Sequence, residues 1–189
     1  ALASRSYSTV EMDAILDELT EDEQIELLEL LEVEDEYRRS HQLFEYAPYG
    51  KQREFMDAGA EFTERCFMAG NQLGKTLTGG AEVAFHLTGR YPGTAGYPDG
   101  GAYKDDWTGR RFNEPVVFWV GGETNETVTK STQRVLCGRI DEGNEPGYGM
   151  IPKDDIVSYV KSPFFPGLID RILVRHHNAE GVEDGASLV

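Results

Sequence analysis

Apolar residues near the start of the chain recur every three or four positions, which is typical of amphipathic helices. One apolar stripe runs through residues 12–19 and a second through residues 25–31. Each follows a capping-box sequence, at residues 8–11 and 20–23, in which a hydroxyl and a carboxylate satisfy backbone N–H groups at a helix start. The pattern predicts two short helices, an acidic N-terminal helical hairpin over residues 1–42.

From residue 43 onward, short apolar runs alternate with helical stretches. Strands are predicted at residues 65–69, 115–120 and 171–175, with another entered at 185–189. Helices are predicted at 52–60, at 75–88, after a cap at Thr124 or Asn125, and from Pro152 through 154–159. This order predicts parallel strands joined by crossover helices. The expected fold class of residues 43–189 is α/β, a P-loop NTPase-type parallel sheet with flanking helices. The chain begins without Met and ends in an apparent strand, which we interpret as a fragment.

A glycine-rich run joins the first predicted strand to the helix at 75–88: Ala69-Gly70-Asn71-Gln72-Leu73-Gly74-Lys75-Thr76. It fits the phosphate-loop pattern, with Ala in place of the usual first Gly. Glycine lets backbone N–H groups turn toward phosphate oxygens, and the helix start adds its positive dipole end. Lys75 would bring its charge to the β- and γ-phosphates, and the Thr76 hydroxyl could ligate Mg²⁺. The alternative is an ordinary glycine-rich turn with a surface lysine.

A glutamine precedes this loop, in the predicted helix at 52–60. The amide of Gln52 offers both a donor and an acceptor, which match N6 and N7 of adenine, and Tyr46 or Tyr49 could stack on the base. Alone, this is a weak signal, because most surface glutamines have no specific role.

An acidic strand end, which phosphate-loop hydrolases use to complete the Mg²⁺ shell and polarise water, is not found in the sequence. The nearest match is Leu168-Ile169-Asp170, but the preceding Pro166-Gly167 leaves it too short. Glu123 follows a strand in the wrong order. We therefore expect nucleotide binding, with little or no hydrolysis by these residues alone.

Charge is unevenly distributed. The net charge is −16, and residues 1–40 carry thirteen acidic residues against three arginines, which gives −10 there and leaves −6 for the rest. Such an arm would repel DNA, and the remainder is not basic enough to indicate a DNA-binding surface. No membrane span or signal peptide is visible. Cys66 and Cys137 are interpreted as reduced core residues, and the adjacent His176 and His177 as a strand end rather than a metal site.

Three motifs together resemble the N-terminal part of a tailed-bacteriophage terminase large subunit. They are PYGKQREF at 48–55, MAGNQLGKT at 68–76 and LTGRYP at 87–92, and the resemblance covers roughly residues 43–189. It implies the ATPase portion of a viral DNA-packaging motor, which couples ATP hydrolysis to translocation of double-stranded DNA into a procapsid in the host-cell cytoplasm. Many relatives carry an Arg inside the loop, where this chain has Asn71 and Gln72.

The resemblance also implies the cofactors, site residues and partners. ATP and Mg²⁺ would be bound, with Gln52 reading adenine and Lys75 and Thr76 handling the phosphates and the metal. The acidic strand and an endonuclease domain would lie beyond Val189. Expected partners are double-stranded DNA, the small terminase subunit, the portal protein and further copies in a ring, with no membrane.

Two other functions stay open. A small-substrate phosphotransferase uses the same loop, but it needs an arginine-rich lid, and only Arg90, Arg110 and Arg111 follow the loop closely. A non-catalytic module could dock through the acidic hairpin, whose alternative role is to pack on its own domain.

Overall fold

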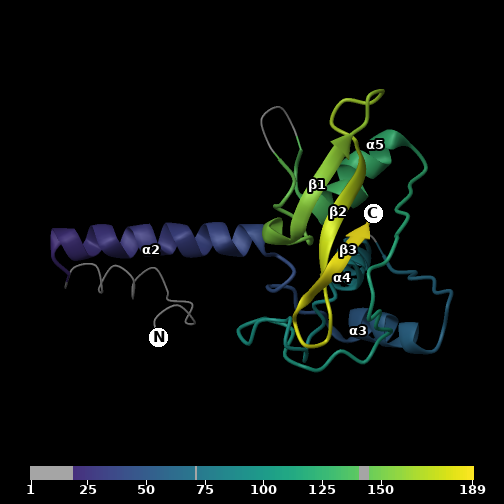
Figure 1. Cartoon of the computed structure of the whole chain (residues 1–189), viewed down its shortest axis with the longest axis horizontal. Coiled ribbons are helices and arrows are strands. Elements are labelled where there is room, and N and C mark those ends of the chain that lie inside the picture. The colour runs from purple at the N-terminus through teal and green to yellow at the C-terminus, as the bar shows by residue number, and fades with distance from the viewer. Residues whose placement is uncertain (1–18, 71, 141–144) are drawn as a thin grey trace. The chain divides into compact units, whose positions relative to one another are not determined.

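The computed structural model describes residues 19–70, 72–140 and 145–189 (Figure 1). The chain divides into two compact units, residues 1–37 and 38–189. Helix α2 (Glu21–Ser40) begins in the first unit and ends in the second. In the described part of the chain, no helix has the length and apolar character required to cross a membrane.

The start of α2 confirms the capping box predicted there. The Thr20 backbone N–H donates to Glu23 Oε2 at 2.9 Å, and the Glu23 N–H donates to Thr20 Oγ1 at 3.4 Å. The hydrogen bond from the Thr20 backbone N–H and, second, the one from the Thr20 hydroxyl lower the pKa of the Glu23 carboxyl that accepts both. Residues 12–18 of the first predicted helix lie outside the described residues, so the hairpin stays a prediction.

Helix α4 (Lys75–Thr88) forms the centre of the second unit and has the predicted bounds. Its inward face is fully buried at Ala81, Ala84, Phe85 and Leu87. The irregular segment after α4 packs aromatic rings around Phe85, at centroid distances of 5.2 Å to Trp107 and 6.3 Å to Tyr97 and Tyr103.

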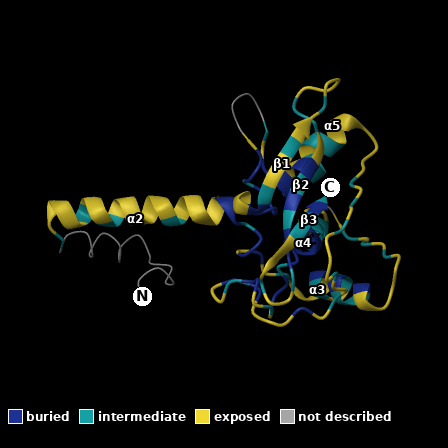
Figure 2. Ribbon diagram, viewed as in Figure 1, coloured by how far each residue is buried: buried dark blue, intermediate teal, exposed yellow. Residues whose placement is uncertain are grey.

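A three-stranded antiparallel sheet contributes to the same core as α4. Its strands are β1 (Ile156–Lys161), β2 (Ile169–His177) and β3 (Glu183–Leu188), in the order β1-β2-β3. Tyr159 pairs with Ile172, and Val174 with Ser187. The middle strand is the most buried, as Figure 2 shows. The strands predicted at 171–175 and 185–189 are thereby confirmed, with β3 beginning two residues early.

The predicted parallel P-loop sheet is wrong for the described residues. Residues 65–69 pair with no strand, and residues 115–120 make a single parallel bridge, Val117 with Leu188. In both runs the side chains alternate between partly buried and exposed, and Trp119 is 93% and Met68 86% exposed. Apolar composition made these runs look like central strands, but strand pairing depends on a partner distant in sequence. The strands that do pair follow one another along the chain, which favours antiparallel pairing.

The other predicted helices are partly confirmed. Helix α3 (Gly50–Asp57) continues as the 3₁₀-helix η1 (Ala58–Ala60). Thr124 caps a helical segment, its Oγ1 accepting the Thr127 N–H at 3.1 Å. The segment consists of α5 (Asn125–Thr127), the π-helical η2 (Val128–Gln133) and α6 (Arg134–Cys137).

The helix predicted from Pro152 through 154–159 is wrong. One 3₁₀ turn, η3 (Lys153–Asp155), leads directly into β1. The first strand residues include Ile156 and Val157, and β-branched side chains favour the extended backbone.

Candidate functional site

The glycine-rich loop lies directly before α4. Gly74 adopts the left-handed conformation (φ 72°) and is the N-cap of the helix, and Gln72 also has a positive φ of 62°. Turns of this kind occur in backbone concavities that bind anions. Gly70, Gln72 and Leu73 are exposed, whereas Asn71 lies outside the described residues.

Lys75 turns back over the loop that precedes it. Its Nζ donates to the carbonyl oxygens of Ala69 and Gly70, both at 2.7 Å. The ammonium group is therefore held beside the loop, with carbonyl oxygens as its partners. Phosphate oxygens are stronger acceptors for the same donor, so an incoming anion could replace these carbonyls.

Thr76 is exposed on the first turn of α4, next to Lys75. The first N–H groups of an α-helix have no partner within the helix, and the dipole of the 14-residue α4 favours an anion there. Within residues 19–70, 72–140 and 145–189, no group of three or more His, Cys, Asp or Glu side chains could hold a metal. The hydroxyl of Thr76 stays a predicted ligand.

Two residues at the N-terminal end of α3, its N-cap Tyr49 and Gln52, lie against the loop, and Tyr46 contacts Gln52 from the segment before the helix. Tyr49 Oη donates to the Leu73 carbonyl at 2.7 Å. Gln52 is 4% exposed, and its Nε2 would lie 2.5 Å from a Cβ placed on Gly74. Tyr46 Oη lies 3.3 Å from Gln52 Oε1 and 3.4 Å from Thr78 Oγ1. The structure thus places Gln52 beside the loop and buries it, and its reading of adenine stays a prediction.

A partly buried ion pair joins the segment before the loop to α4. Arg65 Nη2 lies 2.8 Å from Glu82 Oε1, and Arg65 Nη1 donates to the Phe55 carbonyl at 2.7 Å. The guanidinium also covers the Phe55 ring, 4.7 Å from its centroid. Sequence reasoning missed this pair, because nothing local to Arg65 or Glu82 indicates that they meet.

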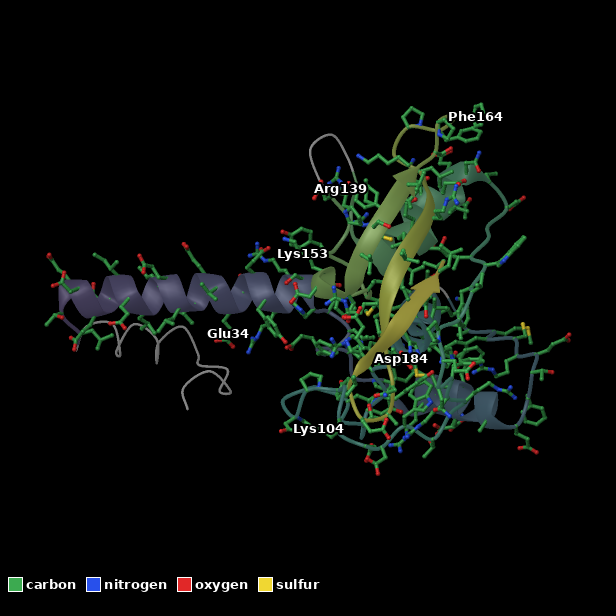
Figure 3. The ribbon with its side chains drawn as sticks, viewed as in Figure 1. Glu34, Lys104, Arg139, Lys153, Phe164 and Asp184 are labelled. Carbon is green, nitrogen blue, oxygen red and sulfur yellow. The ribbon has the colours of Figure 1, made fainter. Side chains whose placement is uncertain are left out.

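The two adjacent histidines at the end of β2 are structural. His176 Nδ1 lies 2.6 Å from Oδ1 of Asp184, a β3 residue that is labelled in Figure 3. His177 faces Thr88 O and Arg90. His177 is the last residue of its strand, which confirms the predicted strand end.

A separate apolar groove of about 400 Å³ lies between β2 and the helical segment 128–137. No residue of the glycine-rich loop lines it. Val117, Trp119, Leu136 and Ile172 are among its walls. Asp170, the nearest sequence match to an acidic strand end, is an exposed residue of β2 beside this groove. Asp170 therefore lies beside this groove, which no residue of the glycine-rich loop lines.

Comparison with known proteins shows the family to which the chain belongs. Residues 66–189 match the family described as terminase large subunit, T4likevirus-type, N-terminal. The chain belongs to this terminase large subunit family. It is 70% identical over 179 residues to the terminase large subunit of Salmonella phage P22, and 41% identical over 184 residues to that of Enterobacteria phage LP7. These alignments cover 95% and 89% of the chain but only 36% and 35% of the relatives. No solved structure matches the chain.

Proposed function

We propose that this chain is the ATP-binding part of a viral DNA-packaging motor. One observation carries the proposal: Lys75, at the start of a long helix, is folded onto a loop whose last residue before it is a left-handed glycine. This combination of positive charge, free helix N–H groups and close backbone approach is the physical requirement for binding a nucleotide phosphate chain. Membership of the terminase large subunit family supports the same assignment.

Each loop residue has a separate role in this proposal. Lys75 would leave the Ala69 and Gly70 carbonyls and bind β- and γ-phosphate oxygens. The exposed hydroxyl of Thr76 would serve as one Mg²⁺ ligand. When bound, Mg²⁺ would neutralise charge on the phosphates. The chain itself supplies the positioning and the positive charge.

Hydrolysis and translocation are proposed for the longer protein. The chain spans about a third of the length of the curated relatives it matches, 36% and 35%. We place the acidic residues of the ATPase and an endonuclease domain in that longer protein. Double-stranded DNA, the small terminase subunit, the portal protein and further copies in a ring are its proposed partners, in the host cytoplasm.

A phosphotransferase is less well supported, because the arginines that would form its lid have structural contacts. Arg90 forms an ion pair with Asp155 at 2.8 Å. Arg110 Nε donates to Gly59 O at 3.1 Å, and Arg111 Nη2 donates to Trp107 O at 3.0 Å. Releasing them toward a substrate would break contacts that hold the segment after α4.

Titration of the purified chain with Mg·ATP, followed by calorimetry, tests the proposal. We expect saturable binding that Lys75→Ala lowers by at least about tenfold, since a charge-assisted contact contributes about 1.5–3 kcal/mol. Lys130→Ala is the matched control, because Lys130 also lies near a helix start but pairs with Glu126 on the surface. Binding that is absent from the parent chain, or equal in the parent and Lys75→Ala, would contradict the proposal and favour the non-catalytic module.

A further inference from the structure

Arg65 joins three parts of the fold that surround the glycine-rich loop. It lies in the segment that enters the loop, four residues before Ala69. Its Nη1 donates to the Phe55 carbonyl of α3 at 2.7 Å, and its Nη2 lies 2.8 Å from Oε1 of Glu82 in α4. Two nitrogens of one planar group therefore hold the entry of the loop between two helices.

The surroundings of the guanidinium fix its position. The Glu82 side chain is 6% exposed and that of Arg65 is 21% exposed. A carboxylate this buried is costly unless a cation stays beside it, so Glu82 retains the guanidinium. The Phe55 ring lies 4.7 Å from the guanidinium, and the Phe67 ring stacks on that same Phe55 ring at a centroid distance of 4.8 Å. Phe67 thus joins the entry segment to α3 a second time, nearer the loop.

Gly59 of η1 lies against the same guanidinium. A Cβ there would lie 2.9 Å from Arg65 Cζ and 3.0 Å from Nη1, so the guanidinium would have to move. Gly59 is in a 3₁₀-helix and its φ is not positive, so alanine meets no backbone strain there. This glycine is therefore a position at which Arg65 can be displaced without removing any charge.

We infer that Arg65 is a positioning residue, which holds the entry of the glycine-rich loop in the arrangement that binds phosphates. This inference rests on the proposed function, because it concerns the same loop. The exit of the loop is fixed by α4, of which Gly74 is the N-cap and Lys75 the first residue. The entry, residues 65–69, belongs to no helix, so the contacts of Arg65 set the fraction of chains with the loop correctly placed. The apparent affinity for a ligand falls in proportion to that fraction.

Calorimetric titration with Mg·ATP compares the parent chain with Arg65→Met and Gly59→Ala. Arg65→Met keeps an unbranched side chain and removes the guanidinium. We expect it to weaken binding by about tenfold, which corresponds to about 1.4 kcal/mol. Gly59→Ala keeps every charge and displaces the guanidinium, and we expect a smaller loss of about threefold, because part of the contact remains.

Arg90→Met controls for a general loss of stability. The Arg90 Nε lies 2.8 Å from Asp155, and the two side chains are 24% and 2% exposed, so this ion pair is buried to a similar degree. Arg90 follows α4, whereas Arg65 precedes the loop. Arg90→Met should lower the melting temperature about as much as Arg65→Met and leave the affinity unchanged. Titrations are made well below each melting temperature, and circular dichroism checks that each variant is folded.

The outcomes are distinct. An unchanged affinity in Arg65→Met, or a loss that Arg90→Met shares, would overturn the positioning role and leave the proposed function intact. A loss in Arg65→Met that is absent from Gly59→Ala would assign the effect to charge and overturn it as well. If Arg65→Met does not fold, Gly59→Ala against Arg90→Met decides alone. A parent chain that does not bind Mg·ATP would instead remove the proposed function, and the inference with it. Losses in both Arg65→Met and Gly59→Ala, absent from Arg90→Met, would support the inference.

Discussion

Arg90 and Asp155 form a bidentate ion pair that joins the end of α4 to the start of the sheet. Arg90 Nε donates to Asp155 Oδ2 at 2.8 Å, and Nη2 donates to Oδ1 at 3.0 Å. The Asp155 side chain is only 2% exposed, whereas that of Arg90 is 24% exposed. The pair therefore lies at the boundary between core and solvent, where a planar guanidinium can satisfy both carboxylate oxygens.

Replacing Arg90 should lower the stability of the fold. Arg90→Met leaves the Asp155 carboxylate buried without its partner, and we expect the free energy of unfolding to fall by about 3 kcal/mol. Urea denaturation at pH 7 measures this. Lys130→Met, which breaks the exposed pair with Glu126, should cost less than about 1 kcal/mol. Equal losses in the two variants would contradict a special role for the buried pair.

His177 should make the stability of the chain depend on pH. Burial and, secondarily, Arg90 lower the pKa of His177 below its ordinary value of 6.5, while Asp155, Thr88 O and Glu183 act in the opposite direction. The unfolded chain therefore takes up a proton near pH 6.5 while the folded chain stays neutral at this site. Stability contributed by neutral His177 is complete above pH 6.5 and is lost as the pH falls toward the lower, folded-state pKa.

His177→Gln isolates this effect, because glutamine does not titrate. Free energies of unfolding of the parent and the variant are measured between pH 8 and pH 5, a range spanning about 1.5 units on either side of the ordinary histidine pKa. We expect the advantage of the parent to shrink as the pH falls. A difference that is constant with pH would show that the site does not titrate differently in the folded and unfolded states.

Local signals account for what the sequence predicted well. The bounds of α4 follow from Gly74 and Gly89, which both adopt positive φ and mark the two ends of the helix. The cap at Thr20 and the cap at Thr124 are equally local. Each signal lies within a few residues of the feature it predicts, so no knowledge of the tertiary fold was needed.

Pairing between distant segments accounts for what was wrong or missed. Residues 115–120 have the composition of a central strand, yet Val117 makes one bridge, and the parallel sheet does not appear among the described residues. The resemblance implied that Gln52 reads adenine, whereas its position against Gly74 and its burial were not expected. Cys66, interpreted as a core residue, is exposed because the strand around it does not pair.

The two cysteines should consequently differ in reactivity. Cys66 is exposed, whereas burial raises the pKa of the Cys137 thiol to about 12, and only the thiolate reacts with disulfide reagents. At pH 8, which is near the ordinary thiol pKa of about 8.5, we expect Cys66 to react rapidly with dithionitrobenzoate. Cys137 should react only after denaturation. Cys66→Ser should abolish the rapid phase. A rapid phase that survives in Cys66→Ser would contradict the burial of Cys137.

Two glycines of the same helix region should respond to alanine in opposite directions. Gly89 ends α4 with φ 68°, and a Cβ there would lie 1.9 Å from the His177 carbonyl oxygen, so the backbone of β2 would have to move. We expect Gly89→Ala to destabilise the fold by more than about 1 kcal/mol.

Gly79 lies within α4, and a Cβ there meets nothing within 4 Å. Alanine lowers the entropy of the unfolded chain and favours helix, so Gly79→Ala should stabilise by about 0.5–1 kcal/mol. Thermal and urea unfolding of both variants measure the signs, and a loss of stability in Gly79→Ala as large as that in Gly89→Ala would show that the helix end is not what makes Gly89 necessary.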